Sequence, residues 1–420
     1  MKENNYSKIL KDELLVAVGC TEPIAVAYAS AKARDILGEF PEKITVRCSG
    51  NIIKNVKAVI VPGTKDMTGI ETSAILGAIV GKSELELALL NDVNEGHVIE
   101  LKDKLMQNIC KVELVENIPN LYIEIYMEAN GNSSSVEIVE SHNNITKITK
   151  NNEIVFETCN GNESCACKHD LDKFSLSSIL EYINTVPFEE LYNILNKQVE
   201  CNINIGEYGL NNLYGANVGK TIFNSSIESP YKNAKSIAAS GSDARMNGCV
   251  MPVVINSGSG NQGITASVPA IVYARENGFS EEKMYRALAL SNLVSIYIKS
   301  GIGKLSAFCG AVNAACGAGC AIAYLNDEDT KIIEATIINC LANIGGIACD
   351  GAKSSCAAKI ASSLDGALLA YEMAKTGNAF KPGEGLVEAS VDKTIRNFWR
   401  MGKEGMKSTD VEILNIMIGE

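Results

Sequence analysis

The stretch "LSAFCGAVNAACGAGCAIAYL", residues 305–325, decides how the second half of the chain folds. It carries no charged residue, and most of its residues are Ala, Gly or Cys. Helices made of such small residues pack closely and bury most of their faces. Further apolar helical runs lie on both sides of it, over residues 268–277, 281–298, 330–343 and 352–376. We therefore predict that residues 171–420 form an all-α domain with a buried site.

A different pattern precedes this part of the chain. Residues 111–157 alternate apolar and polar side chains, as in "LYIEIYMEA" and "SSVEIVE". This alternation predicts an antiparallel sheet with one face toward water. The other elements expected here are strands over 43–50 and 55–63 and helices over 68–91 and 98–108. Residues 42–160 thus form a smaller α+β domain, and the fold class of the whole chain is α+β with a mostly helical larger domain.

The first 41 residues are predicted to form two helices, over residues 7–18 and 23–37, separated by "GCTEP". Pro23 stands at an early helical position, where its missing N–H costs nothing. We expect both helices to pack on the helical domain.

Charge and composition limit the class of protein. The 420 residues carry a formal net charge of −12, which argues against a nucleic-acid or anionic-membrane partner. We find neither a signal peptide nor a strongly apolar run of about 20 residues, so a cytoplasmic protein without a membrane partner is expected. Fourteen cysteines in a reducing compartment are expected to be buried, metal-bound or catalytic. With three histidines, a His-based zinc site or a Ser-His-Asp triad is hard to build.

The cysteines of the helical half are candidate metal ligands. Cys309 lies in the opening stretch, and "GIACDGAKSSC" adds Cys349 and Cys356, about two helical turns apart if the run is helical. An iron–sulfur cluster needs thiolates that converge from several elements, and the neighbouring small residues leave room for one. The alternative is that each cysteine is a small core hydrophobe. That alternative is favoured for the cysteines within regular helical runs, which are Cys316, Cys320 and Cys340.

A second candidate chelator is "CACKH", Cys165–His169, in a polar segment that is predicted to be a linker. Its C-x-C-x-H spacing suits zinc or iron, but no fourth ligand is evident. An exposed accident of composition is the alternative.

The segment "AVGCTEPIAVA" places Cys20 directly before a predicted helix. Free N–H groups and the helix dipole favour a thiolate there, while Glu22 opposes it by like charge. Such a thiolate can be a nucleophile or a general base. A cysteine without a task near the helix start is the alternative.

The segment "INSGSGNQGITASVPA" contains a literal G-x-G-x-x-G. No second strand with an acidic end follows, so we reject a dinucleotide fold. We expect a Ser/Gly loop whose N–H groups bind an anion, such as a substrate carboxylate, before a helix. "SGSDARMNG" (240–248) and "KSGIGK" (299–304) resemble it as polar interruptions. Their cations Arg245, Lys299 and Lys304 would offset a bound carboxylate.

Four motifs in this order, "GCTEPIAVA", "SGSGNQG", "GKLSAFCGA" and "GIACDGAKSSC", resemble the L-cysteine desulfidase family. This group is serine dehydratase alpha-like and related to the iron–sulfur L-serine dehydratases, and the resemblance spans nearly the whole chain. It implies an oxygen-sensitive [4Fe–4S] cluster with one open iron, held by Cys309, Cys349 and Cys356. It also implies that Cys20 is the catalytic base.

The implied reaction is β-elimination from L-cysteine to hydrogen sulfide, ammonia and pyruvate, without pyridoxal phosphate. The residues expected to bind substrate are Glu22, Ser257, Gly258, Ser259, Gly260, Asn261, Gln262 and Lys304. The alternative substrate is L-serine or another β-substituted amino acid. A pyridoxal enzyme would have to use Lys304, which no phosphate-binding motif frames. A cluster-based sensor would need an output module, and none is evident. A homodimer is one expected assembly.

Overall fold

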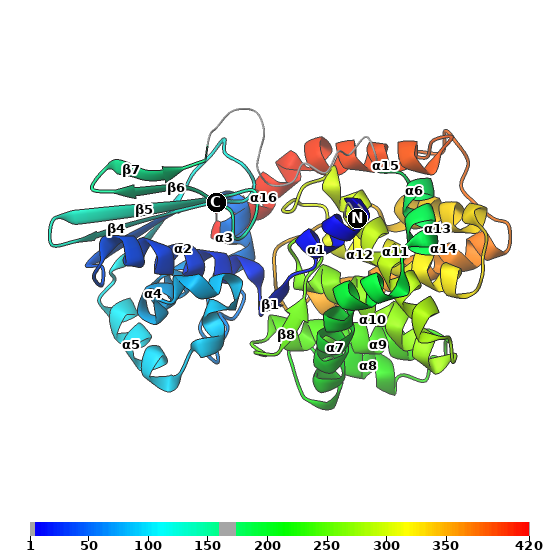
Figure 1. The fold of residues 1–420 in the computed structure, drawn as a ribbon, viewed down its shortest axis with the longest axis horizontal. Helices are drawn as coiled ribbons and strands as arrows, with labels where there is room; N and C mark the ends of the chain where they lie inside the picture. Colours follow the sequence, from blue (N-terminus) through cyan, green and yellow to red (C-terminus); the bar gives the residue numbers. More distant parts are fainter. Residues whose placement is uncertain (1–4, 159–173, 420) are drawn as a thin grey trace.

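The computed structural model describes residues 5–158 and 174–419, and its elements form two lobes (Figure 1). The sheet lobe, residues 21–158, has its own hydrophobic core, and the helical lobe, residues 5–18 and 174–405, has a larger one. The predicted α+β class is confirmed.

The sheet has six strands in the order β3-β2-β4-β5-β6-β7. Their bounds are β2 (Lys43–Cys48), β3 (Cys110–Leu114), β4 (Tyr122–Ala129), β5 (Asn132–Val139), β6 (Ile145–Lys150) and β7 (Glu153–Glu157). Alternate residues of β4, such as Ile123, Ile125 and Met127, are fully buried, which is the pattern that the sequence predicted. The pairing is antiparallel except for β2 with β3, because a helical crossover joins these two strands.

Helices form the crossover between β2 and β3, and helices cover one face of the sheet (Figure 1). The helices are α2 (Thr21–Leu37), α3 (Gly50–Val56), α4 (Ile70–Val80), η1 (Ser83–Asp92) and α5 (Glu95–Met106). A strand over 55–63 was wrongly predicted: α3 covers its start, and only an isolated bridge from Ile60 to Thr68 remains.

The packing of α2 also corrects the sequence analysis. We expected α2 on the helical domain, but its buried side chains belong to the core of the sheet lobe, against α4 and strands β4 and β5. A Cβ at Gly77 of α4 would overlap the backbone of Ala27, so the two helices are in direct backbone contact. Small residues on α2 thus serve this close contact.

The N-terminal segment does join the helical lobe. Helix α1 (Asn5–Glu13) ends earlier than predicted, and strand β1 (Val16–Val18) follows it. β1 pairs antiparallel with β8 (Pro252–Val254), which is a small strand pair in a half that we predicted to be all helical.

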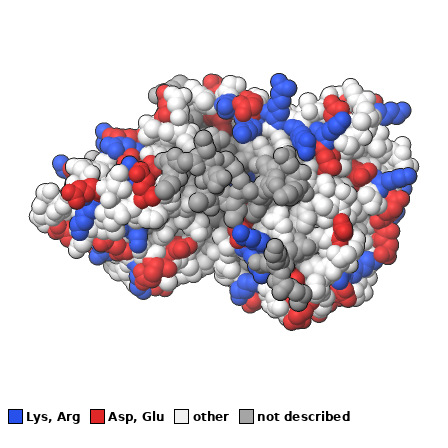
Figure 2. Space-filling view, turned by 45° about the horizontal axis from the view of Figure 1, so that its top comes forward, with Lys and Arg blue, Asp and Glu red and all other residues white. Residues whose placement is uncertain are grey.

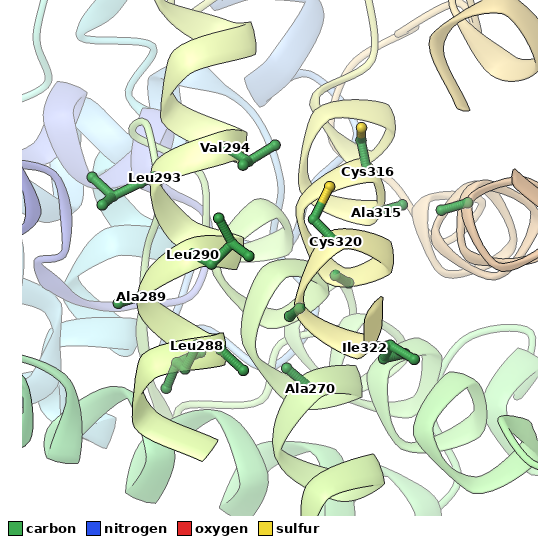
Figure 3. Close-up of a cluster of buried hydrophobic side chains, with 14 of the residues drawn as sticks. Ala270, Leu288, Ala289, Leu290, Leu293, Val294, Ala315, Cys316, Cys320 and Ile322 are labelled. Carbon is green, nitrogen blue, oxygen red and sulfur yellow. The ribbon is translucent and has the colours of Figure 1, made fainter. Parts of the chain in front are cut away.

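The helical lobe is otherwise built as predicted. Its helices are α6 (Leu176–Thr185), α7 (Phe188–Asn211), α8 (Val218–Asn224), α9 (Lys232–Met246), α10 (Gly260–Glu276), α11 (Glu281–Ser300), α12 (Gly310–Leu325), α13 (Thr330–Ile344), α14 (Cys356–Lys375) and α15 (Val391–Arg400). Figure 3 shows Cys316 and Cys320 of α12 within the apolar cluster beside α11, and both thiols are fully buried. Cys340 is buried and contacts Cys316, so these three cysteines occupy core positions.

One predicted interruption is wrong. "SGSDARMNG" does not break the helix, because α9 continues through it to Met246. Its small residues are needed for close packing: a Cβ at Gly209 of α7 would overlap the backbone oxygen of Ser240.

The chain returns to the sheet lobe at its end. After α15, a π-helical turn (Met401–Gly405) leads to α16 (Lys407–Ile418), which packs on α3 (Figure 1). Asp410 of α16 forms an ion pair with Lys54, whose side chain is 1% exposed. Basic and acidic side chains are interspersed over the described surface in the view of Figure 2. None of the helices within residues 5–158 and 174–419 combines the length and apolarity that crossing a membrane requires.

Candidate active site

A cavity of about 90 Å³ lies where the two lobes meet. That volume is below the range of sites for drug-sized ligands, so it suits a small molecule. The predicted site residues that line it are Cys20, Glu22, Ser259, Asn261, Gln262, Lys304, Cys309, Cys349 and Cys356. Ser257, Gly258 and Gly260 were also predicted but do not line it. Four further polar residues do: Asn55, Arg245, Lys299 and Ser306.

Two loops bring the three predicted ligand thiols to one wall. Cys309 precedes α12, and its backbone N–H donates to Ile347 at 2.9 Å, while the N–H of Cys349 donates to Ala307 at 2.7 Å. These bonds flank an isolated bridge between Phe308 and Ala348 and hold the two loops side by side. Cys356 begins α14.

The thiols of this wall differ in pKa, and therefore in how readily each becomes a thiolate. The Cys309 thiol donates to Cys349, and the ammonium groups of Lys54 and Lys299 add to this, so the pKa of Cys349 lies below its ordinary value. The same hydrogen bond, together with burial, raises the pKa of Cys309. Burial lowers the pKa of Lys299 to about 8, although the two thiols oppose this shift. The wall therefore favours a negative sulfur beside buried cations.

Within the described residues, no three His, Cys, Asp or Glu side chains gather closely enough to hold a single metal ion. In a polynuclear cluster each thiolate binds its own iron. The Cys309 and Cys349 thiols, which are hydrogen-bonded here, would have to separate to bind two irons. Three thiols on one cavity wall, beside small residues and buried cations, fit that donor set. The second candidate chelator, "CACKH", lies outside the described residues.

Cys20 reaches the cavity because β1 pairs with β8. The chain turns at Gly19, whose φ is +70°, and Cys20 then precedes α2. The thiol donates to Glu22 Oε2 at 3.0 Å. Burial and then the Glu22 charge raise the pKa of Cys20 well above its ordinary value. The expected thiolate is therefore not favoured here, because desolvation and a neighbouring carboxylate outweigh the helix N-terminus.

Glu22 is charged at the centre of a hydrogen-bond network. Burial raises its pKa, but His142 and the donors around it outweigh this and bring the pKa to about 2. Asn55 donates to Oε1 at 3.2 Å, and Thr21 Oγ1 lies 3.2 Å from Oε2 and 2.9 Å from the oxygen of Gly258. His142 Nε2 lies 3.8 Å from Oε1. Sequence reasoning missed His142, and its place as one of three histidines was the one available signal.

The Ser/Gly loop precedes α10, as expected, but the N–H groups of Ser259 and Gln262 bond within the loop, and its anion-binding role stays a prediction. Ser257 and Gly258 have positive φ values of +51° and +83°, and Ser259 caps α10 by accepting from the Gln262 N–H at 3.4 Å. The side-chain oxygens of Asn261 and Gln262 are buried without a hydrogen-bond partner among the described residues.

Arg245 enters the cavity from α9. Its side chain is 3% exposed, and its Nε has no hydrogen-bond partner within the described chain. A Cβ at Gly260 would overlap this guanidinium, so Gly260 contributes by leaving room for Arg245. Lys304, at the cavity edge, lies 3.5 Å from Glu13 and 3.4 Å from the Ser141 hydroxyl.

Comparison with known proteins shows the family of the chain. The family model described as serine dehydratase alpha chain matches residues 84–415, and the chain belongs to that family. A UPF0597 protein of Lachnoclostridium phytofermentans is 48% identical over 98% of both chains. A second, from Desulfitobacterium hafniense, is 44% identical over 99% of this chain and 96% of its own. A third, from Finegoldia magna, is also 44% identical, over 99% of both. The membership supports a lyase of the dehydratase kind.

Proposed function

We propose that the protein is an iron–sulfur-dependent lyase that converts L-cysteine to hydrogen sulfide, ammonia and pyruvate. The observation that carries this proposal is the meeting of Cys309, Cys349 and Cys356 with the Cys20–Glu22 pair and Arg245 around one small cavity. These residues come from both lobes and from five separate segments of the chain. An amino acid needs a binding group for its carboxylate, a base at its α-carbon and a group that accepts its leaving atom.

Cys309, Cys349 and Cys356 would hold a [4Fe–4S] cluster. When bound, the cluster supplies a Lewis-acidic iron that lowers the cost of expelling the substrate sulfur. The buried ammonium groups of Lys54 and Lys299 offset the negative charge of the thiolates. Lys54 also donates to the backbone oxygen of Cys349 at 3.2 Å, which fixes the loop.

Arg245 would bind the substrate carboxylate. A guanidinium and a carboxylate form strong, paired hydrogen bonds, and burial strengthens them. Asn261 and Gln262, with unpaired oxygens at the same wall, would accept from the substrate ammonium group. The three residues thereby fix the orientation of the α-carbon.

Cys20 would take the α-proton as a thiolate. It lines the same cavity as the three ligand thiols, next to Glu22. The low exposure of Cys20, 2%, excludes bulk water from this step. Aminoacrylate, the product of elimination, tautomerises and hydrolyses to pyruvate and ammonia without further help.

L-Serine is the second candidate substrate, because the matching family model is described as a serine dehydratase. The same carboxylate site and base would serve, with water in place of hydrogen sulfide as the leaving product. The ratio of kcat/KM for the two substrates decides between them.

The test is made on protein purified without oxygen. We expect about four irons and four sulfides per chain, a brown chromophore that changes on addition of L-cysteine, and release of sulfide. Cys349→Ala should lose the chromophore, whereas the matched core variant Cys316→Ala should keep it. Absence of iron after anaerobic reconstitution, or a chromophore that responds to no amino acid, would overturn the proposal.

A further inference from the structure

The free thiol of Cys20 poses a problem that the proposed function does not solve. A base must first lose its own proton, and Cys20 donates that proton to Glu22. A carboxylate that is fully charged at neutral pH is a poor final acceptor. The proton therefore needs a further destination next to Glu22.

His142 occupies that place. It belongs to the turn between β5 and β6, its side chain is 3% exposed, and its Nε2 has no hydrogen-bond partner within the described residues. The two oxygens of Glu22 face opposite partners. Oε2 accepts from Cys20 at 3.0 Å, and Oε1 lies 3.8 Å from His142 Nε2. One carboxylate therefore connects the thiol to the imidazole.

We propose that Cys20, Glu22 and His142 form a proton relay in which His142 receives the thiol proton through the Glu22 carboxylate. The S–H bond of Cys20 breaks and its proton passes to Oε2 of Glu22. The carboxyl group, now neutral, turns about its Cγ–Cδ bond and gives this same proton to His142 Nε2. The net result is a thiolate, an unchanged carboxylate and an imidazolium. This assignment rests on the proposed function and makes His142 a positioning residue that acts through Glu22.

The charged surroundings of His142 are arranged for this final state. Glu22 of α2 is the carboxylate that faces it and stabilises an imidazolium. Lys304, in the loop before α12, lies near His142, because both side chains border Gly258. A Cβ placed on Gly258 would lie 3.0 Å from the imidazole Cε1 and 3.4 Å from Lys304 Cδ. Glu13 of α1 lies 3.5 Å from Lys304 Nζ and balances its charge. Arg245 favours the Cys20 thiolate through its charge.

The relay can be tested through the chemistry of Cys20 alone, without turnover. We would measure the rate at which iodoacetamide alkylates Cys20, by peptide mass spectrometry, across pH 6–9. Losing the imidazolium leaves Glu22 uncompensated, so His142→Asn should slow Cys20 alkylation at pH 7 by about tenfold, the effect of one pKa unit. His97→Asn, in the exposed start of α5, is the matched control and should leave the rate unchanged.

Because His142→Asn also changes a buried position, the unaltered protein supplies a second measurement. With ¹⁵N-labelled histidine, the chain has three imidazoles to resolve. Neutral His142 should carry its proton on Nδ1, which leaves Nε2 able to accept. A proton on Nε2 in the neutral form, or wild-type alkylation in His142→Asn, overturns the relay. Normal alkylation results without sulfide release would instead count against the proposed function.

Discussion

Arg245 is a buried cation whose surroundings call for an anion. Its guanidinium is enclosed between α9 and the start of α10, and its Nε lacks a hydrogen-bond partner among the described residues. Burying a charge with incomplete pairing is costly, so such a group is retained where a ligand completes it. The neighbouring buried oxygens of Asn261 and Gln262 lack partners in the same way.

Arg245→Gln is expected to raise KM for L-cysteine about ten- to a hundredfold, because a charge-assisted hydrogen bond is worth about 1.5–3 kcal/mol. The melting temperature of the unliganded protein should not fall, since the variant removes an incompletely paired charge. Steady-state kinetics and thermal unfolding check both. Arg275→Gln, at the exposed end of α10, is the control. An unchanged KM would remove Arg245 from the site.

For individual site residues, the sequence motifs were better predictors than the local pattern of apolar and polar residues. The cavity gathers most of the residues that four motifs had singled out, although they come from distant parts of the chain. Arg245 and Lys299 were expected to offset the charge of a bound carboxylate but were not placed among the site residues, and Asn55 and His142 were missed. Their positions depend on how α3 and the β5–β6 turn pack against α2, and no local pattern encodes that packing.

Asp243 shows how one side chain holds an element in place. Within α9 it accepts the Gly219 N–H at 3.0 Å and thereby caps the start of α8. It is 2% exposed, and its Oδ1 has no partner in the described part of the chain. Burial raises its pKa to about 6, although the backbone bonds oppose this. The folded state thus binds a proton that the unfolded state releases from pH 3.8 upward.

The contribution of Asp243 to stability should therefore fall as pH rises from about 4 through 6, where the folded state holds a proton on this group that the unfolded state has released. Asp243→Asn keeps the acceptor oxygen and removes the charge. We expect a gain on the order of 1–3 kcal/mol at pH 7.5, shrinking toward zero near pH 4. Denaturant unfolding at several pH values measures it. An equal effect at both ends of the range would contradict the charge as its cause.

Gly351 shapes the loop that carries Cys349. Its φ is +94°, and a Cβ there would overlap the backbone oxygen of Lys54. The loop therefore presses against α3 with no space between the backbones. Only glycine satisfies both the left-handed backbone and this contact.

Gly351→Ala is expected to lower the free energy of unfolding by more than about 2 kcal/mol, because backbone strain and overlap add. It should also lower the iron bound after anaerobic reconstitution. Gly383→Ala is the matched control, because its φ of +91° is similar but nothing lies near its Cβ position. A similar loss of unfolding free energy in both variants would show that backbone strain alone, and not overlap with Lys54, causes the effect.

Element by element, helices with strong apolar runs could be predicted well, as α11 to α14 show. The failures have physical causes. Residues 55–63 have the β-branched texture of a strand, yet their backbone is used for a helix end and turns around Ile60. In α9, Gly and Ser read as a break, but they serve as contact surfaces between helices, which local propensity cannot distinguish from a turn.

The whole molecule is joined by segments that cross between the lobes. β1 leads into α2, and α16 returns from the helical lobe to α3. Asp410 of α16 meets Lys54, which is almost fully buried, and accepts from Asn51 at 3.1 Å. Lys54 in turn binds the backbone of the Cys349 loop. The Lys54 ammonium group therefore connects α16 to the loop that carries Cys349 at the cavity.

Asp410→Ala should lower the free energy of unfolding by about 3–5 kcal/mol, since it removes the carboxylate that pairs with the buried Lys54 ammonium group. Lys54→Met combined with Asp410→Leu should recover most of that loss. Glu404→Ala, which breaks the exposed pair with Lys407, should cost less than about 1 kcal/mol. Chemical denaturation measures all three. A double variant as unstable as Asp410→Ala would show that the packing of α16, and not the ion pair, matters.

The Lys54–Asp410 pair joins residues that are 356 positions apart. Strand β1 can pair only after β8 has been synthesised. During synthesis on the ribosome, the N-terminal segment with Cys20 emerges long before the partners that position it. The Cys20 turn cannot reach its final place until β8 has emerged, and the Lys54 anchor of the Cys349 loop lacks its ion-pair partner until Asp410 has left the exit tunnel. Delivery of any metal cofactor to this cavity is therefore expected to follow translation, and a cell that lacks the cofactor would accumulate complete but inactive chains.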